Sequence, residues 1–207
     1  MTAIFEEEDG NTPLSPEEEL DLIPPLTTRS ELNQAERLNI NEARVWGMRR
    51  STLARDDIVT DVFGRDLHKR MFNQVWKWAG RYRVSEKNLG WEPRRLTEGV
   101  RNVFDDAKYW LANGTFPVEE AAVRFHYQLV QVHSWPNGNG RHARLMADII
   151  MAASGNPELT WGARTDLAAK GEARIKYLEA IRMADVSGDT RTRPVRVTWV
   201  EVQNRPL

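Results

Sequence analysis

The sequence predicts a mainly α-helical protein, and three observations support this prediction. Apolar residues recur at spacings of three and four over several long segments, as they do along one face of a helix. Glycine, asparagine and proline residues stand where these segments stop. No alternating strand–helix repeat appears, as an α/β fold with a parallel sheet would require.

Length and composition restrict the kind of protein. The 207 residues fit one domain with appendages better than two full domains. Hydrophobic residues make up 41% of the chain and include 8 Trp, which is enough to build a core. The formal net charge of -1 gives no global basic field that would favour nucleic acid or an anionic membrane. The chain has no Cys, which excludes a disulfide framework and thiolate metal sites.

The sequence shows no targeting signal or membrane segment. No apolar run approaches the roughly 20 residues of a membrane span. The N-terminus lacks the basic start and the apolar stretch of a secretory signal. We therefore expect a cytoplasmic protein with no membrane contact and no direct binding to nucleic acid.

Residues 1–28 form an acidic N-terminal arm with eight acidic residues and no basic one. Within it, Ser15 and Pro16 are followed by three glutamates. Ser as the N-cap, Pro at the first helical position and acids in the first turn predict a short helix. We interpret the arm as mobile or partly docked, and a solvated tail without a role is the alternative.

Two helices are predicted after the arm. Ser30 can cap the first, which lies within residues 29–56 and runs to about Arg50. The second covers residues 57–79, and Gly80 suits its end. Its apolar face is formed by Phe63, Leu67, Met71, Val75 and Trp78.

A third helix is predicted from Thr97 to Ala112, where a clean apolar stripe ends at Asn113 and Gly114. The segment before it, residues 81–96, has no helical period. A short hairpin or extended flap is the better interpretation of that segment.

Two buried helices are predicted next. Residues 118–132 carry apolar side chains on two adjacent stripes, which is typical of a helix buried on much of its circumference. Residues 141–153 repeat the pattern, and residues 154–157 (Ser-Gly-Asn-Pro) stop it.

The C-terminal part of the chain carries weaker patterns. A further helix is predicted over residues 165–184. In the tail, residues 187–207, apolar and polar residues alternate from Arg193 to Val202 as in a strand. An edge strand, a partner-binding segment and a disordered end all remain open for this tail.

The segment that joins the two buried helices, His133 to Arg144, has the features of an anion site. Gly138, Asn139 and Gly140 allow the backbone to turn tightly just before a helix. The N–H groups at such a helix N-terminus can point at an anion. The turn therefore predicts a phosphate site.

Two arginines and a histidine add to this prediction. Arg141 and Arg144 are three residues apart and share a face of the first helical turn. The helix dipole disfavours cations there, and a bound polyphosphate would offset that cost. A neutral His133 beside phosphates could take a proton from an attacking hydroxyl. Each feature alone is more often structural, but their joint occurrence between two buried helices favours a polyphosphate site.

The same residues carry a resemblance to the Fic/Doc family. The family pattern is His-x-Phe-x-(Asp/Glu)-Gly-Asn-Gly-Arg-x-x-Arg, and this chain resembles it from His133 to Arg144, with Trp135 as the aromatic residue. The wider resemblance runs from about Asp57 to Ala184. A subgroup called mobile mystery protein B is similar through Glu31-Leu32-Asn33, Met71-Phe72, residues 76–80, Glu86-Lys87-Asn88 and residues 133–148.

This resemblance implies a Fic-type helical bundle with a short β-hairpin flap, with a catalytic domain over residues 57–186. It also implies a protein adenylyltransferase, which moves AMP from ATP to a Tyr, Ser or Thr hydroxyl of a target protein. His133 would be the general base. Gly138, Asn139 and Gly140 would cradle the α- and β-phosphates, Arg141 would hold the β-phosphate and Arg144 the γ-phosphate. The flap, expected to hold the target in an extended form, would consist of Val84, Ser85, Glu86, Lys87, Asn88 and Leu89.

At Asn137 the chain departs from the pattern of the family that it resembles. Most members of that family have an Asp or Glu there, which holds Mg²⁺. An amide oxygen can coordinate Mg²⁺ but lacks the charge. We expect Mg²⁺ to arrive with ATP and to be held mainly by the nucleotide. We expect no metal site from His126, His133 and His142, since the chain lacks Cys and His142 lies beside two arginines.

The resemblance also implies regulation. Many Fic proteins carry an inhibitory glutamate that pairs with the second motif arginine, here Arg144. The inhibitory signature of the family this chain resembles is Ser/Thr-x-x-x-Glu-Gly/Asn. Thr27 to Glu31 fit its first part, although Leu32 follows, and make Glu31 a candidate; Glu36 is an equal candidate on the same predicted helix. Ordinary exposed helix acids are the alternative. The similarity to mobile-element proteins suggests a small regulator or antitoxin as partner.

Three functions remain open at this point. AMP transfer leads because the chain keeps the Gly-Asn-Gly run, which Doc-like kinases usually break. A Doc-like kinase, or transfer of another nucleotide or phosphate on the same fold, is the second. A catalytically weak binding or regulatory protein is the third, and Asn137 is its main support.

Overall fold

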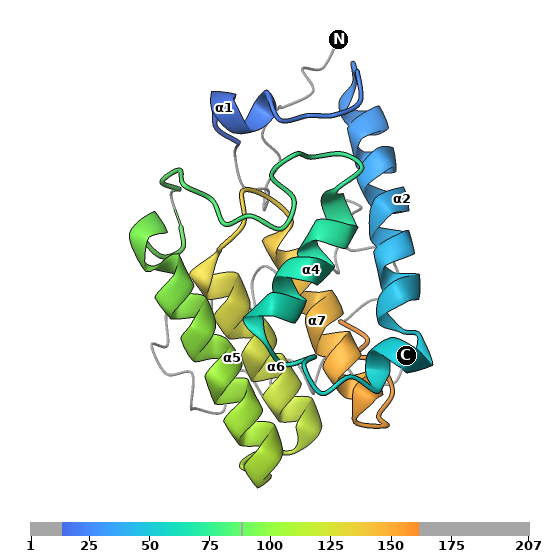
Figure 1. Cartoon of the computed structure of the whole chain (residues 1–207), viewed down its shortest axis with the longest axis vertical. Helices are drawn as coiled ribbons and strands as arrows, with labels where there is room; N and C mark the ends of the chain where they lie inside the picture. The colour runs from blue at the N-terminus through green and yellow to red at the C-terminus, as the bar shows by residue number, and fades with distance from the viewer. Residues whose placement is uncertain (1–13, 88, 162–207) are drawn as a thin grey trace, which may run out of the picture. The chain divides into compact units, whose positions relative to one another are not determined.

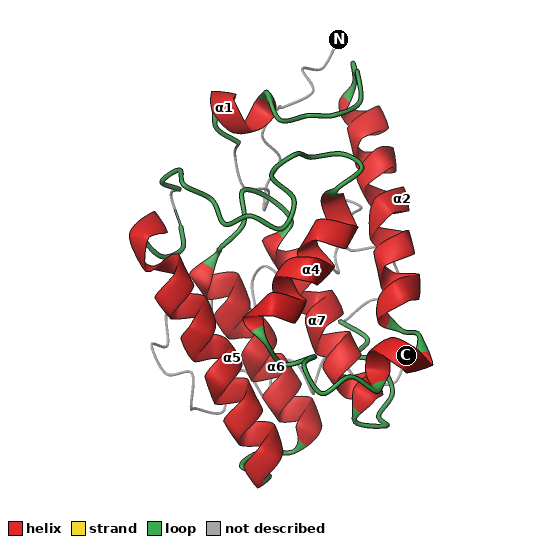
Figure 2. Ribbon diagram, viewed as in Figure 1, coloured by secondary structure: helices red, strands yellow, loops and turns green. Residues whose placement is uncertain are grey.

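The computed structural model describes residues 14–87 and 89–161. These residues form seven α-helices and one 3-10 helix, with no strand among them (Figure 2). The chain divides into two units, Met1–Pro157 and Glu158–Leu207, and every helix named below belongs to the first. In chain order the helices are α1 (Pro16–Glu19), α2 (Arg29–Gly47), α3 (Arg50–Leu53), α4 (Asp61–Phe72), η1 (Pro93–Arg95), α5 (Leu96–Asn113), α6 (Val118–Val132) and α7 (Asn139–Ala153).

The predicted helical bundle is confirmed. Helix α6 packs against both α5 and α7, while α2 packs against α4, which also contacts α7 (Figure 1). Helix α7 is the most buried of these helices, because its residues from Leu145 to Met151 all lie in the interior. Helices α4 and α6 complete this core with Phe63, Leu67, Met71, Phe125 and Leu129.

The N-terminal helix starts follow the capping rules, with one correction. Ser15 caps α1 as predicted, because its side chain accepts the Glu18 N–H while the Glu18 side chain accepts the Ser15 N–H. Helix α2 is capped by Thr28 rather than Ser30, since Thr28 forms the same reciprocal pair with Glu31. The predicted end at Arg50 is also wrong, because α2 stops at Gly47 and α3 follows.

The predicted helix over residues 57–79 is too long. Helix α4 begins at Asp61 and ends at Phe72, whose carbonyl accepts the N–H groups of both Val75 and Trp76 in a tight turn. The arm then takes over the backbone of the next residues: Ile23 donates to the Val75 carbonyl, and Leu22 forms an antiparallel bridge with Trp76. These tertiary bonds replace helical ones, so the apolar pattern continues without a helix.

The predicted β-hairpin flap is not confirmed. The flap, residues 81–87 and 89–92, contains no strand. It is tied instead to the last residue of α6 and to the chain that follows this helix. The Arg83 N–H donates to the Ser134 carbonyl at 2.9 Å, and the Trp91 N–H donates to the Val132 carbonyl at 3.1 Å.

The helices predicted on either side of the motif are confirmed with small shifts. Helix α5 ends at Asn113, and Gly114 takes the left-handed conformation at φ 60°. Helices α6 and α7 match their predictions, although α7 starts two residues earlier, at Asn139. The predicted helix over residues 165–184, the tail of residues 187–207 and residues 1–13 of the arm lie outside the described residues.

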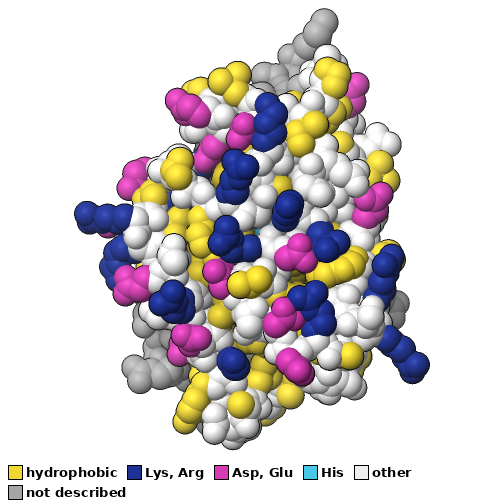
Figure 3. Space-filling model, in the orientation of Figure 1, with side chains coloured by type: hydrophobic (Ala, Val, Ile, Leu, Met, Phe, Trp, Pro, Cys, Tyr) yellow, Lys and Arg dark blue, Asp and Glu magenta, His cyan; other side chains and the backbone are white. Residues whose placement is uncertain are grey.

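The face drawn in Figure 3 has no large patch of a single charge. Lys and Arg side chains are interspersed there with Asp and Glu side chains (Figure 3). Among the described residues, no helix has the length and apolarity needed to cross a membrane.

Candidate active site

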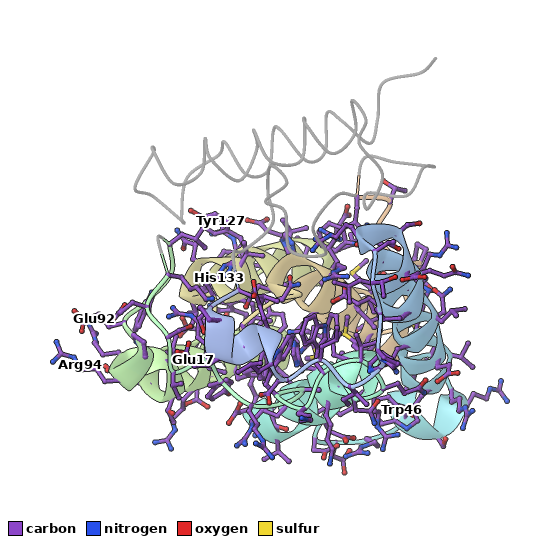
Figure 4. All side chains as sticks on the ribbon, turned by 90° about the horizontal axis from the view of Figure 1, so that it is seen from above. Glu17, Trp46, Glu92, Arg94, Tyr127 and His133 are labelled. Atoms are coloured by element: carbon purple, nitrogen blue, oxygen red, sulfur yellow. The ribbon has the colours of Figure 1, made fainter. Side chains whose placement is uncertain are left out.

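The site lies where α6 ends and α7 begins, at the same end of the bundle as α1 (Figures 1 and 4). Helix α6 ends at Val132, and the next residue, His133, is its C-cap and adopts left-handed backbone angles of φ 54° and ψ 55°. A buried guanidinium holds this conformation, because Arg83 Nε donates to the His133 carbonyl at 2.7 Å. Arg83 was not predicted from the sequence, because nothing in its local pattern points to this role.

The turn between the two helices is closed by a side-chain amide. Asn139 Oδ1 accepts the Trp135 N–H, and Asn139 Nδ2 donates to the Trp135 carbonyl, both at 2.9 Å. The Trp135 ring is buried and stacks on His68 with ring centroids 4.0 Å apart. Asn139 therefore fixes the shape of the turn with its side chain, while its backbone belongs to the helix N-terminus.

Two buried histidines, His68 and His142, form hydrogen bonds with the turn. The Gly80 N–H donates to His68 Nδ1, so His68 Nε2 carries the proton and donates to the Asn137 carbonyl at 3.2 Å. The Trp135 indole donates to His142 Nδ1, and His142 Nε2 donates to a carbonyl of α4 at 2.9 Å. Burial lowers the pKa of His142 to about 4, so both contacts of its neutral form persist near neutral pH.

Gly138 is required by the geometry at the start of α7. Its φ is 81°, and a Cβ there would lie 2.3 Å from the Phe72 ring. No side chain caps α7, so the N–H groups of its first turn are oriented to receive an anion. The predicted phosphate cradle of Gly138, Asn139 and Gly140 is thus a helix N-terminus held in place by the packed turn.

Arg141 and Arg144 lie on the part of α7 that reaches the surface. From Asn139 to Met151, only Gly140, Arg141 and Arg144 are not buried. The Arg141 guanidinium lies 5.1 Å from the Phe72 ring centroid. The Arg144 guanidinium acts on α6, where burial first and then this charge hold the pKa of His126 well below its ordinary value.

A buried glutamate of α2 contacts the first arginine. Glu36 Oε2 accepts a hydrogen bond from Arg141 Nη1 at 2.6 Å, and Glu36 Oε1 accepts one from the Trp76 indole at 2.8 Å. The Glu36 side chain is only 4% exposed. The other candidate, Glu31, is exposed and accepts the N–H groups of residues 27 and 28 at the start of α2. Glu36 thus contacts Arg141, and not the Arg144 that the family resemblance implied.

His133 is electrostatically suited to the neutral form. Burial lowers its pKa to about 4, and the Arg83 guanidinium adds to this effect. The side chain is buried at 7% exposure and lies against the flap. At Gly90 the flap backbone comes so close that an added Cβ would lie 2.5 Å from His133 Cβ. A neutral imidazole in this position can accept a proton.

The site offers little to a metal ion by itself. No group of three or more His, Asp or Glu residues suited to a metal ion occurs in the described part of the chain. Asn137 Oδ1 accepts the Gly138 N–H at 2.7 Å and lies 3.5 Å from Arg141 Nη2. One amide oxygen fits Mg²⁺ only when phosphate oxygens supply most of the other ligands.

The flap residues lie beside this site but do not act alike. Val84 is 91% exposed and Leu89 is 45% exposed. Ser85 and Lys87 are bonded to Glu18 of α1. Glu86 is exposed, and Asn88 lies outside the described residues.

Comparison with known sequences decides the family. The family model described as Fic/DOC family matches residues 61–151, from the start of α4 to near the end of α7. Over these residues the chain belongs to the Fic/DOC family. The match contains the whole turn with His133, Arg141 and Arg144.

Individual relatives agree with this assignment. The chain is 31% identical over 135 residues to Protein adenylyltransferase fic-1 of Caenorhabditis elegans, a match that covers 61% of this chain and 24% of that protein. It is 33% identical over 111 residues to Protein adenylyltransferase Fic of Nematostella vectensis, covering 49% of this chain and 23% of that protein. The chain thus spans about a quarter of the length of the curated relatives it matches.

A solved structure shows the shared fold. The N-terminal FIC domain of the Bep8 protein from Bartonella sp. 1-1C superposes with a TM-score of 0.67, covering 89% of this chain and 90% of that one. The two are 14% identical, so the fold persists where most of the sequence has changed.

Proposed function

We propose that this chain is a protein adenylyltransferase, which transfers AMP from ATP to a Tyr, Ser or Thr hydroxyl of a target protein. One observation carries the proposal: a buried neutral His133 stands beside a helix N-terminus that presents Arg141 and Arg144. The names of the curated relatives support the reaction class, because both are protein adenylyltransferases.

Each residue of the site has its own role in the proposed reaction. The N–H groups at the start of α7 hold the α- and β-phosphates, Arg141 the β-phosphate and Arg144 the γ-phosphate. The target hydroxyl attacks the α-phosphorus while His133 takes its proton. A new bond joins the hydroxyl oxygen to the α-phosphorus, the bond between this phosphorus and the bridging oxygen breaks, and pyrophosphate leaves.

Mg²⁺ would neutralise charge on the phosphates when it is bound. Asn137 is the residue of this chain that would hold it, through its amide oxygen, with the nucleotide supplying most other ligands. This arrangement predicts a weak metal site that forms together with ATP binding.

The flap is proposed to bind the target segment in an extended form, with Val84, Ser85, Glu86, Lys87, Asn88 and Leu89 as its contact strip. The exposure of Val84 supports this role, since a residue that is 91% exposed can contact a partner. A target with apolar residues beside its hydroxyl would suit the strip.

Regulation is proposed to act through Glu36. Its carboxylate bonds the guanidinium that would hold the β-phosphate, so ATP must displace it. Glu31 is the weaker candidate because it already caps α2. The proposal also includes a small regulator or antitoxin as partner and action in the cytoplasm.

A second function is favoured by Asn137 and by the occupied Arg141. Both features suit a catalytically weak Fic-fold protein that works by binding. A Doc-like transfer of the γ-phosphate is the remaining alternative on the same fold.

One labelling experiment separates these functions. The protein and its His133→Ala variant are incubated with cell lysate and ATP labelled at the α- or the γ-phosphate, after matching melting curves confirm that both are folded. Label from the α-phosphate that depends on His133 supports AMP transfer. Label from the γ-phosphate indicates a kinase, and no His133-dependent label with either nucleotide refutes the enzyme.

A further inference from the structure

The N-terminal arm holds the flap through one buried acid. Helix α1 has three consecutive glutamates, and only Glu18 among its residues is buried. Its neighbour Glu17, labelled in Figure 4, is exposed. A helix of one turn cannot form by itself in water, so α1 owes its order to the contacts it makes.

Both oxygens of the Glu18 carboxylate are bonded to the flap. Oε1 accepts the Ser85 hydroxyl at 2.6 Å, and Oε2 accepts the Lys87 ammonium at 2.6 Å. The two charged side chains are 10% and 5% exposed, which makes this a buried ion pair. Burial raises the pKa of Glu18, but the hydrogen bonds from Lys87 and Ser85 outweigh it and keep the acid ionised near neutral pH.

Helix capping alone does not account for these contacts. In the capping box of α1 the Glu18 carboxylate has one bond to make, accepting the Ser15 N–H at Oε2 over 2.8 Å. The bonds to Ser85 and Lys87 join residues 67 and 69 positions apart in the chain. The arm is also fixed beyond α1, since the Trp78 indole donates to the Glu18 carbonyl and Ile23 donates to the Val75 carbonyl.

The flap between its two anchors depends on this contact. Arg83 bonds one end of the flap to the turn after α6, and Trp91 bonds the other end to Val132, the last residue of α6. Between these anchors, the described side chains of Ser85 and Lys87 are bonded to α1, while Val84 beside them is exposed. The Lys87 charge also lowers the pKa of His133, after burial and Arg83, so the ion pair lies within electrostatic range of the proposed base.

We infer that Glu18 is a positioning residue: it clips the flap to α1 and thereby sets the conformation in which the flap receives the target protein. The reference to a target rests on the proposed function, whereas the clip is a property of the fold. Loss of the Glu18 contact frees the flap, so the enzyme would bind its target more weakly and bind ATP as before.

Hydrogen–deuterium exchange tests the clip without any activity. We would compare peptides that cover residues 81–87 in the wild type and in the variants Glu18→Gln and Lys87→Met. Lys87→Met leaves the capping box of α1 intact, so it separates the clip from the order of the helix. Glu17→Gln is the matched control, one position away and exposed.

The clip predicts faster exchange in both variants, by about tenfold, the effect of losing one charge-assisted hydrogen bond. The control should exchange like the wild type. A double variant that combines Glu18→Gln with Lys87→Met should exchange no faster than either single variant, because each single substitution already breaks the Glu18–Lys87 ion pair. Unchanged exchange in Glu18→Gln and Lys87→Met would overturn the clip.

The KM for the target protein is a second readout, and a purely structural role of Glu18 would leave it unchanged. The KM for the modified protein should rise about tenfold in Glu18→Gln, with the affinity for ATP unchanged. Faster labelling of the target in this variant would contradict a positioning role. If no variant and no wild-type protein transfers label, the proposed function fails, and the exchange result alone decides the clip.

Discussion

Glu36→Gln is the substitution that most directly probes how the site is regulated. It removes the charge of a side chain that is 4% exposed and keeps its shape. The amide oxygen of Gln can still accept the Trp76 indole, which Glu36 now accepts at 2.8 Å. Arg141 loses its carboxylate partner at 2.6 Å and becomes available to a phosphate.

The size of the effect follows from this contact. A hydrogen bond to a charged group contributes about 1.5–3 kcal/mol. Arg141 is 29% exposed, so solvent screens part of that energy and the lower end applies. ATP would no longer have to displace Glu36, and its affinity should rise about tenfold, which corresponds to about 1.4 kcal/mol.

Calorimetric titration with a non-hydrolysable ATP analogue measures this change. Glu31→Gln is the matched control, because it removes an acid of the same helix that contacts neither motif arginine. Melting curves would show whether either variant is destabilised. Equal or weaker binding in Glu36→Gln than in the wild type would refute the idea that Glu36 competes with the phosphates.

Four further predictions concern the turn and its supports. Gly138→Ala should lower the melting temperature and abolish labelling, because the backbone is left-handed and the new Cβ would lie 2.3 Å from a ring of α4; unchanged melting would contradict this packing. Gly90→Ala should reduce labelling with little change in ATP affinity, since its Cβ would lie 2.5 Å from His133 Cβ; full activity would show that the flap approach is not needed. Burial lowers the pKa of His142 in the fold from the ordinary 6.5 to about 4, so its contribution is fully present above pH 6.5, and this residue alone should lower the free energy of unfolding by about 1.4 kcal/mol per pH unit as the pH drops toward 4; urea midpoints that stay constant from pH 7 to pH 5 would oppose this. Asn137→Asp should raise turnover and tighten the Mg²⁺ dependence of labelling, and an unchanged or lower rate would argue for another metal arrangement.

The local patterns of the sequence predicted much of the fold. Helices α5, α6 and α7 were predicted because their apolar spacing, their stop signals and their burial all agree. The turn with Gly138 was predicted because its residues are adjacent in the chain and their backbone preferences act locally. The end of α4 was not, because Val75 and Trp78 are buried in turns and so continue an apolar period without a helix.

The supports of the site could not be predicted, because they are long-range. His68 reaches the Asn137 carbonyl across 69 positions of the chain, and Arg83 reaches His133 across 50. Glu18 looked like one of many acids in an acidic arm until the fold placed it against Ser85. Such side chains have no local spacing rule, and only the packing of distant segments reveals their partners.

The central claim is that the turn after His133 and the first turn of α7 form a pocket for a nucleoside polyphosphate. Calorimetry with a non-hydrolysable ATP analogue, on the wild type, Glu36→Gln and an Arg141→Ala/Arg144→Ala double variant, tests it most directly. We predict one nucleotide bound per chain in the first two proteins and none in the double variant. Folded wild-type and Glu36→Gln proteins that take up no nucleotide, or a double variant that binds it equally well, would contradict the claim.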